Sequence, residues 1–414
     1  MTFTPLHRVL GLQPSDLTDE ILNAAITAGI EETDDIDWKS EFPAIKGITQ
    51  GDVPKDIAAM ANANGGIIVY GVTETAKAAA GRQHVQEFGE NEERAYRSAA
   101  VSAISPPIFG LNIVELGADL RAIAVIVPAS VDGPHLIYRN DYFGAPIRNG
   151  ADTVWMRERQ IEAMYRARFD EQRRSTEAVD DLHAETSRTH ATPDRAWLVA
   201  VAHPRIPGVL ARPNRDEARG IFECAHSITG DITQCPATYP LDSVDRLNPR
   251  PGLRRWTAPN ASTGHSAWRE AWIATHYDGS VTLAAAIGGH RKSADGYFEP
   301  WEVEARGIEA AVADFTALVR ATAEALHHSE YEVQVGIEWP SDETLQVFTI
   351  DRQGFTYDGV TTPLRVYTPV RTTIDAAAPH EDFHRQARQL AEECVNQGGI
   401  TNLHVIRPVP DPAD

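Results

Sequence analysis

The chain has 414 residues and a formal net charge of −21, with 59 acidic against 38 basic side chains. A chain of this length exceeds what one hydrophobic core usually spans, so two domains are expected. The acidic balance repels nucleic acid, which argues against a general nucleic-acid coat protein but allows an enzyme with unevenly distributed charge. No apolar run reaches the ~20 residues that cross a bilayer, and the N-terminus lacks a signal-peptide pattern. With three cysteines and no C-x-x-C spacing, we expect a cytoplasmic protein without membrane contact or disulfides.

The most informative stretch covers residues 35–74. Residues 36–39 alternate between apolar and polar, which predicts a short strand. A helix capped by Asp52 follows and ends at the Asn-Gly-Gly sequence of residues 64–66, which can adopt positive φ. The apolar run at 67–70 predicts a buried strand. The sequence therefore predicts a strand, a helix, a glycine turn and a second strand, with acidic residues at the outer ends of both strands.

The rest of the first half predicts further strands and helices separated by turn-rich loops. We expect a loop at 73–89, a helix at 91–104, a hairpin of strands 111–116 and 120–127, a strand at 135–138, a loop at 141–150, and a helix from 157 to about 174. Together these elements predict an α+β domain over residues 1–174. Residues 175–193 show almost no apolar periodicity and are predicted to be a linker.

Residues 194–414 are predicted to form a second α+β domain, whose fold the sequence does not identify. The Pro-, Gly- and Arg-rich stretch 204–264 shows few clear elements. Beyond the strand at 196–202, the expected elements are a hairpin of strands 271–276 and 281–287 around Asp278-Gly279, an amphipathic helix at 304–327, strands at 331–339 and 345–350, and a helix at 383–396.

Three motifs follow one another within residues 25–170. They are Glu32 with Asp37-Trp38-Lys39 five positions on, the sequence AMANANGG at 59–66, and Gly71-Val72-Thr73-Glu74. Later come Tyr138, Tyr142, Arg148-Asn149-Gly150 and Met156. In these motifs the first half resembles the AlbA_2 domain of the Schlafen family. Asp37 stands where the family usually has Glu, and Glu74 where it usually has Asp, so the charges are kept while the reach of the side chains differs.

The resemblance implies a divalent-metal-dependent endoribonuclease that acts on structured RNA such as tRNA, with a defence or stress role, or a protein that acts on DNA. Carboxylate oxygens are ligands that Mg²⁺ and Mn²⁺ prefer, and such an ion neutralises phosphate charge and activates water. The candidate catalytic and metal-binding acids are Glu32, Asp37 and Glu74, with Lys39 as an additional catalytic positive charge. The candidate nucleic-acid-binding residues are Arg148, Arg157 and Arg159. Family members with two copies of the domain form a groove between them, so this single copy predicts a homodimer.

Other interpretations remain open from the residues alone. The acidic run at 31–37 is also typical of a solvated segment, which favours a non-catalytic nucleic-acid-binding or regulatory module. The sequence His380-Glu381-Asp382-Phe383-His384 matches the H-E-x-x-H pattern of zinc peptidases, although Pro379 places it in the first turn of a helix with polar flanks. The resemblance also implies that the glycine turn could hold ATP, although the sequence contains no G-x-x-x-x-G-K-[ST] pattern.

Overall fold

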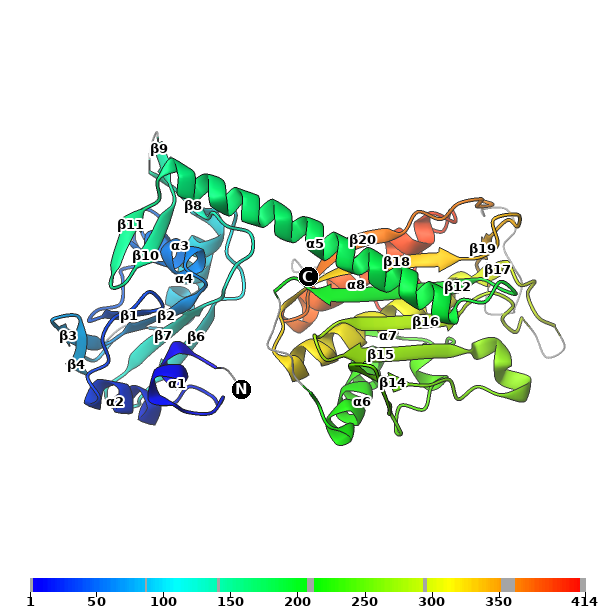
Figure 1. Cartoon of the computed structure of the whole chain (residues 1–414), viewed down its shortest axis with the longest axis horizontal. Coiled ribbons are helices and arrows are strands. Elements are labelled where there is room, and N and C mark those ends of the chain that lie inside the picture. The colour runs from blue at the N-terminus through cyan, green and yellow to red at the C-terminus, as the bar shows by residue number, and fades with distance from the viewer. Residues whose placement is uncertain are drawn as a thin grey trace. The chain divides into compact units, whose positions relative to one another are not determined.

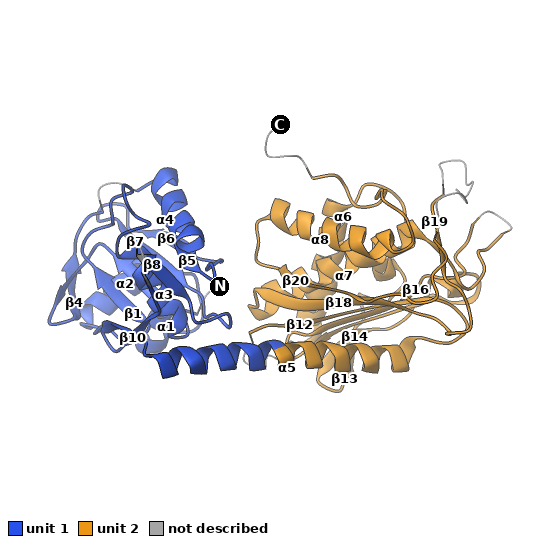
Figure 2. Ribbon diagram, turned by 90° about the horizontal axis from the view of Figure 1, so that it is seen from above, with its two compact units in different colours: residues 1–172 blue, residues 173–414 orange. Residues whose placement is uncertain are grey.

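A computed structural model shows two compact units, residues 1–172 and 173–414, coloured separately in Figure 2. It describes residues 3–85, 88–139, 142–206, 212–292, 296–350 and 362–409. Each unit combines helices with a largely antiparallel sheet, so the predicted α+β class is confirmed. Within the described ranges, no helix is long and apolar enough to cross a membrane.

A four-stranded sheet forms the centre of unit 1, with two helices against each face (Figure 1). The strands, in spatial order, are β1 (Ile36–Lys39), β2 (Gly66–Tyr70), β7 (Ala122–Val127) and β6 (Asn112–Leu116). One face is covered by α3 (Val53–Asn62) and α4 (Glu90–Ser102), and the other by α1 (Pro5–Leu10) and α2 (Asp19–Thr27). Strand β1 is parallel to β2, and the other pairs are antiparallel. The predicted strand, helix, turn and strand are therefore confirmed.

The alternation along β1 decides which side chains can form a polar site. Ile36 and Trp38 are buried in the core beneath α1 and α2. Successive side chains of a strand point to opposite faces, so Asp37 and Lys39 lie on the α3 side. Lys39 is paired in register with Tyr70 of β2, which belongs to the α3 core. The short IDWK strand therefore separates an apolar face from a charged one.

The predicted glycine turn after α3 is present and has a steric cause. Asn64 and Gly65 adopt φ of 75° and 84°. A Cβ on Gly65 would lie 2.6 Å from the backbone nitrogen of Ala129, so only glycine fits this close approach. The Asn62 side chain donates to the carbonyls of His135 and Pro146 and accepts the His135 N–H. Asn62 therefore joins α3 to distant strands.

Two predicted loops of unit 1 contain strands. The described part of 73–89 includes the hairpin of β3 (Val72–Thr75) and β4 (Ala78–Arg82), while residues 86–87 lie outside the described ranges. Its turn uses Ala76 and Lys77 at positive φ, so the usual glycine or asparagine signal is missing. The described part of 141–150 holds β9 (Tyr142–Gly144) and β10 (Pro146–Asn149). Their partners are β8 (Leu136–Arg139), which also pairs with β5 (Ile104–Ser105), and β11 (Asp152–Trp155).

A seven-stranded antiparallel sheet forms unit 2. Its strands, in spatial order, are β13 (Arg250–Gly252), β14 (Arg255–Ala258), β15 (Ala271–His276), β16 (Val281–Ala286), β12 (Trp197–Pro204), β18 (Glu330–Glu338) and β20 (Val370–Asp375). One face carries α6 (Arg215–Ile232), α7 (Ala305–Leu326) and α8 (His380–Asn396). Smaller elements are β17 (Glu302–Glu304), β19 (Gln346–Phe348), η1 (Pro240–Asp242) and η2 (Gly264–Arg269). The β15–β16 hairpin was predicted, whereas α6 was not.

Helix α5 (Glu158–His190) is continuous through most of the predicted linker. Within 175–190 the buried positions are Ser175, Val179, His183 and Thr186, which recur at helical spacing. This part of α5 packs on the unit 2 sheet face opposite α7. Three of the four buried residues are polar, so a search for apolar periodicity alone misses this helix.

Candidate functional site

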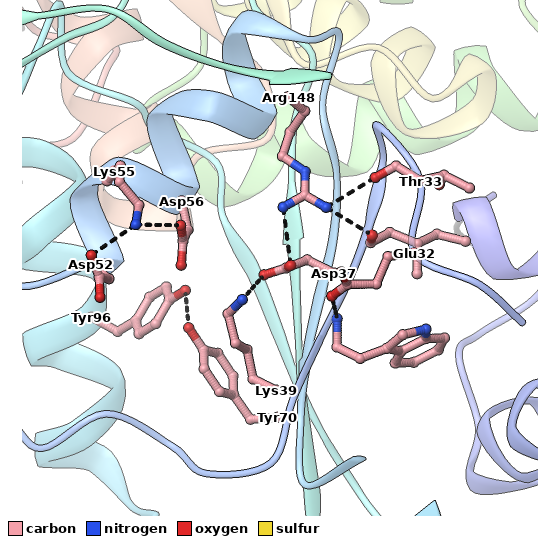
Figure 3. Close-up of polar contacts among 12 residues, drawn as sticks. Glu32, Thr33, Asp37, Lys39, Asp52, Lys55, Asp56, Tyr70, Tyr96 and Arg148 are labelled. Carbon is pink, nitrogen blue, oxygen red and sulfur yellow. Dashed lines mark hydrogen bonds and ion pairs between the residues drawn. The ribbon is translucent and has the colours of Figure 1, made fainter. Parts of the chain in front are cut away.

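An acidic pocket of about 500 Å³ opens at the charged face of β1 in unit 1. Seven acidic and three basic side chains line it, contributed by β1 and its flanking loops, α3, β3 and the β10–β11 hairpin. The predicted catalytic residues Glu32, Asp37, Lys39 and Glu74 all line this pocket. Figure 3 shows Glu32, Asp37, Lys39 and Arg148 together with the α3 residues that face them. Residues as far apart in the chain as Glu32 and Thr153 thus share one cavity.

Asp37 is held by two cations at the base of the pocket. Its Oδ1 accepts a hydrogen bond from Nη1 of Arg148 at 3.1 Å, and its Oδ2 lies 2.8 Å from Nζ of Lys39 (Figure 3). The Lys39 contact is an ion pair without hydrogen-bond geometry, so Oδ2 is a buried oxygen that receives no hydrogen bond. Burial of such a pair makes each partner dependent on the other, because a lone buried charge is costly.

Arg148 is a structural residue in this arrangement. Its side chain is 4% exposed, and Nη2 donates to the carbonyls of Thr33 and Ile36. The guanidinium therefore fixes both Asp37 and the backbone that carries Glu32. The sequence analysis named Arg148 as a candidate for binding nucleic acid, and in the structure its hydrogen bonds go to the protein.

Glu32 is a half-buried carboxyl of the pocket whose pKa is raised by its surroundings. Burial raises the pKa of its carboxyl to about 7, the neighbouring Asp37 and Glu74 add to the rise, and the hydrogen bond from the Trp38 N–H opposes it. That N–H donates to Oε1 at 3.0 Å. Glu74 stands on β3 beside a bulge and is exposed at the pocket rim. The three acids are thus close enough to influence one another.

Asp56 on α3 is a pocket residue that the sequence analysis missed. It is 7% exposed, and burial raises the pKa of its carboxyl to about 6, although nearby Lys39 opposes the rise. For Lys39 itself, burial acts to lower the pKa, but the carboxylates of Asp37, Asp56 and Glu32 together outweigh burial and the net pKa is raised. The sequence signal was present: Asp56 follows Val53 by three positions and precedes Met60 by four, and both are buried. An acid on the core-facing stripe of a helix is expected to need a partner.

The donor atoms of this pocket are chemically suited to a hard divalent cation. Asp37 Oδ2 is buried without a hydrogen bond, and the pKa of Glu32 is raised in part by the neighbouring carboxylates, a repulsion that a cation relieves. Their present arrangement is stabilised by Lys39 and Arg148. Among the described residues, no group of three or more His, Cys, Asp or Glu side chains is arranged so that it could hold a metal ion. A cation must therefore compete with Lys39 for Asp37.

The remaining predicted residues lie outside this pocket. Arg157 lies between β11 and α5, and Arg159 lies in the first turn of α5; both are exposed. Within the described part of the chain, neither forms an ion pair. His380 begins α8, and His384 is buried with an Nε2 that has no hydrogen-bond partner. Among the residues that the structure describes, no third metal ligand lies beside this histidine pair. The H-E-x-x-H sequence thus lies in the first turns of α8, and the described residues provide no zinc-binding group around it.

The sheet flanked by paired helices and the pocket of acids with Lys39 define unit 1 as an α+β domain with a charged site on β1. Residues 32–157 match the family model described as Schlafen, AlbA_2, so unit 1 contains a Schlafen AlbA_2 domain. Such a domain indicates a nucleic-acid-related function. The match covers the predicted acids and ends before unit 2 begins.

Two solved structures resemble part of the chain. The DIP2311 protein of Corynebacterium diphtheriae is 13% identical with a TM-score of 0.25, and the match covers 36% of this chain and 28% of that one. The N-terminal domain of a putative ATP-dependent DNA helicase RecG-related protein from Nitrosomonas europaea is 15% identical with a TM-score of 0.26. The match covers 34% of this chain and 94% of that domain. The chain thus spans under a third of the Corynebacterium protein. A comparison with curated proteins found no match.

Proposed function

We propose that this chain is a nucleic-acid-processing protein whose AlbA_2 domain cleaves RNA with the help of Mg²⁺ or Mn²⁺. The observation that supports this function is the convergence of Glu32, Asp37 and Glu74 on one pocket beside Lys39. Seven acids and three bases line the pocket, so an RNA phosphate is repelled unless cations accompany it. The charge balance therefore favours cation-dependent chemistry over simple phosphate binding.

The residues of the pocket have separate roles in this proposal. Glu32, Asp37 and Glu74 would hold the ion, which when bound neutralises charge on the phosphodiester and lowers the pKa of a water molecule. The Lys39 side chain is 37% exposed, so its ammonium can leave Asp37 and bind a non-bridging phosphate oxygen. Arg148 keeps Asp37 in place from beneath, because its guanidinium is fixed by two carbonyls.

The proposed substrate is structured RNA such as tRNA, and the proposed assembly is a homodimer that places two AlbA_2 domains around one groove. Arg157 and Arg159 are exposed and suited to contact phosphates at its edge. A role in defence or stress within the cytoplasm completes the proposal. Light scattering of the purified chain tests the dimer, and a panel of tRNA, single-stranded RNA and DNA tests the substrate.

Cleavage of labelled RNA with Mn²⁺ tests the catalytic assignment. Glu32→Gln, Asp37→Asn and Glu74→Gln each remove one charged carboxylate with little change in shape, and each is expected to reduce the cleavage rate about 100-fold or more. Glu31→Gln is the matched control, because Glu31 is exposed and does not line the pocket. Variants that cut as fast as the parent would falsify the assignment.

A second candidate is a non-catalytic nucleic-acid-binding module. It is favoured by the ion pairs that already neutralise Asp37 and by the lack of a ready metal-holding group within the described residues. This candidate predicts RNA or DNA affinity that falls steeply as salt rises and no cleavage with any divalent metal. Measuring binding and cleavage on the same preparation separates the two candidates.

A further inference from the structure

A second pocket, of about 610 Å³, adjoins the acidic pocket in unit 1. Glu41 and Pro43 line both pockets and form a shared wall. Among the described residues that line the second pocket none is Lys or Arg, and its charged side chains are Glu41 and Glu92. An anion such as a phosphate is therefore disfavoured here, and a neutral group that carries hydrogen-bond donors is favoured.

One side of this pocket is apolar and suited to a flat ring. It is formed by Phe42, Ile45 and Val85. The Phe42 ring is fixed by edge-on contacts with Tyr70 at 5.0 Å and Phe88 at 5.2 Å between centroids. Ile45 is 40% exposed and adds apolar surface to this wall. Aromatic and aliphatic walls of this kind bind unstacked bases.

The other side carries polar groups that the fold leaves available. Backbone hydrogen bonds from Gln83 to Gly71 and from Val85 to Arg121, both 2.9 Å, hold the segment that presents Gln83 and His84. Nδ1 of His84 accepts the Arg121 N–H at 3.1 Å, so in the neutral ring Nε2 carries the proton and can donate.

This polar side also includes a carboxylate, that of Glu92. Within the described part of the chain, the side chains of Gln83 and Glu92 form no hydrogen bond or ion pair, although both line the pocket. The polar side of the pocket thus offers a carboxylate acceptor together with two donors.

We propose that this second pocket binds a base of the RNA strand, with guanine as the preferred base, while the adjoining acidic pocket takes the backbone. This inference rests on the proposed function, and it says which base the protein recognises beside the proposed cleavage site. The Watson–Crick edge of guanine presents two adjacent donors, N1–H and the N2 amino group, which match the Glu92 carboxylate. Its O6 accepts from Nε2–H of His84 or from the Gln83 amide. Adenine, cytosine and uracil each place an acceptor where guanine has a donor, so each leaves the carboxylate with an unfavourable contact.

Fluorescence anisotropy with labelled RNA heptamers tests this proposal on the full chain. The heptamers are uridine runs with a central G, A, C or U. Binding is measured with Ca²⁺ in place of Mg²⁺ or Mn²⁺, so that a divalent cation accompanies the backbone, and a gel after each titration verifies that the RNA is intact. We expect the parent to bind the G heptamer at least about tenfold more tightly than the other three. Glu92→Gln should abolish this difference and leave the affinity for the U heptamer within about twofold. Glu90→Gln is the matched control, because Glu90 lies on the same helix, pairs with Arg94 and does not line the pocket.

Equal affinity for the four heptamers, failure to bind the G heptamer, or an equal loss for all four in Glu92→Gln overturns the proposal. Thermal denaturation of each variant confirms that the fold is kept. Failure of the proposed function gives a different result: the parent prefers the G heptamer and does not cut RNA with Mn²⁺.

Discussion

The buried pair of Arg148 and Asp37 gives the sharpest stability prediction. Arg148→Met keeps the aliphatic stem and removes the guanidinium that binds Asp37 and two carbonyls. The two side chains are 4% and 2% exposed, so the remaining carboxylate cannot be hydrated without rearrangement. Breaking such a pair costs about 3–5 kcal/mol, and Lys39 still contacts Asp37 Oδ2, so we expect a loss of about 3 kcal/mol.

Calorimetry of the full chain measures this loss, and hydrogen exchange at residues 32–39 identifies the transition of unit 1. For a unit of 172 residues, about 3 kcal/mol corresponds to a fall in Tm of roughly 6–12 °C. The double variant Asp37→Asn/Arg148→Met removes both charges and should lose clearly less than the sum of the single variants. Arg159→Met, at an exposed position, should change stability by less than about 0.5 kcal/mol. A loss below about 1 kcal/mol in Arg148→Met, or additive losses in the double variant, would refute the reasoning.

Three further predictions concern the scaffold. Asn62→Ala removes three buried hydrogen bonds and should cost unit 1 about 2–4 kcal/mol in urea denaturation, whereas exposed Asn91→Ala should change little; equal midpoints would contradict the assigned role. Gly65→Ala should prevent accumulation of folded protein because its Cβ meets backbone at 2.6 Å, while Gly29→Ala, with open space at φ +60°, should cost only about 1–2 kcal/mol; a folded Gly65→Ala protein of parental Tm would disprove the steric argument. Burial raises the pKa of Asp314 to about 7, above its unfolded value of 3.8. Its contribution to the stability of unit 2 is therefore full below about pH 4 and is lost as the pH rises through about 7, with a slope of up to about 1.4 kcal/mol per pH unit. Asp314→Asn should remove this part of the pH dependence, and identical pH profiles for parent and variant would exclude it.

The site was predictable wherever local sequence determines geometry. The alternation of Ile36, Asp37, Trp38 and Lys39 fixes which face carries charge, and the resemblance to AlbA_2 domains pointed to the acids that now share a pocket. Asp56 and the internal role of Arg148 were missed, because both depend on contacts between segments far apart in sequence: Arg148 reaches Asp37 across 111 positions.

The fold was predictable where hydrophobic periodicity was strong. The β15–β16 hairpin, α7 and α8 carry it and were found. Helix α6 was missed although its capping box, Asn214 with Glu217, and its buried face are present, because the surrounding Pro- and Gly-rich sequence resembled a long loop. The second half of α5 was missed because its buried residues are mostly polar. Burial of polar groups is decided by their tertiary partners, which local sequence does not encode.

Crystals of the full chain soaked in Mn²⁺ provide the most direct test of the central claim that the acidic pocket is a cation-dependent cleavage site. The account predicts anomalous density in contact with Glu32, Asp37 and Glu74, with the Lys39 ammonium displaced from Asp37 Oδ2. An Asp37–Lys39 ion pair that stays intact, with no anomalous density in the pocket, in protein that cleaves RNA with Mn²⁺ would contradict it.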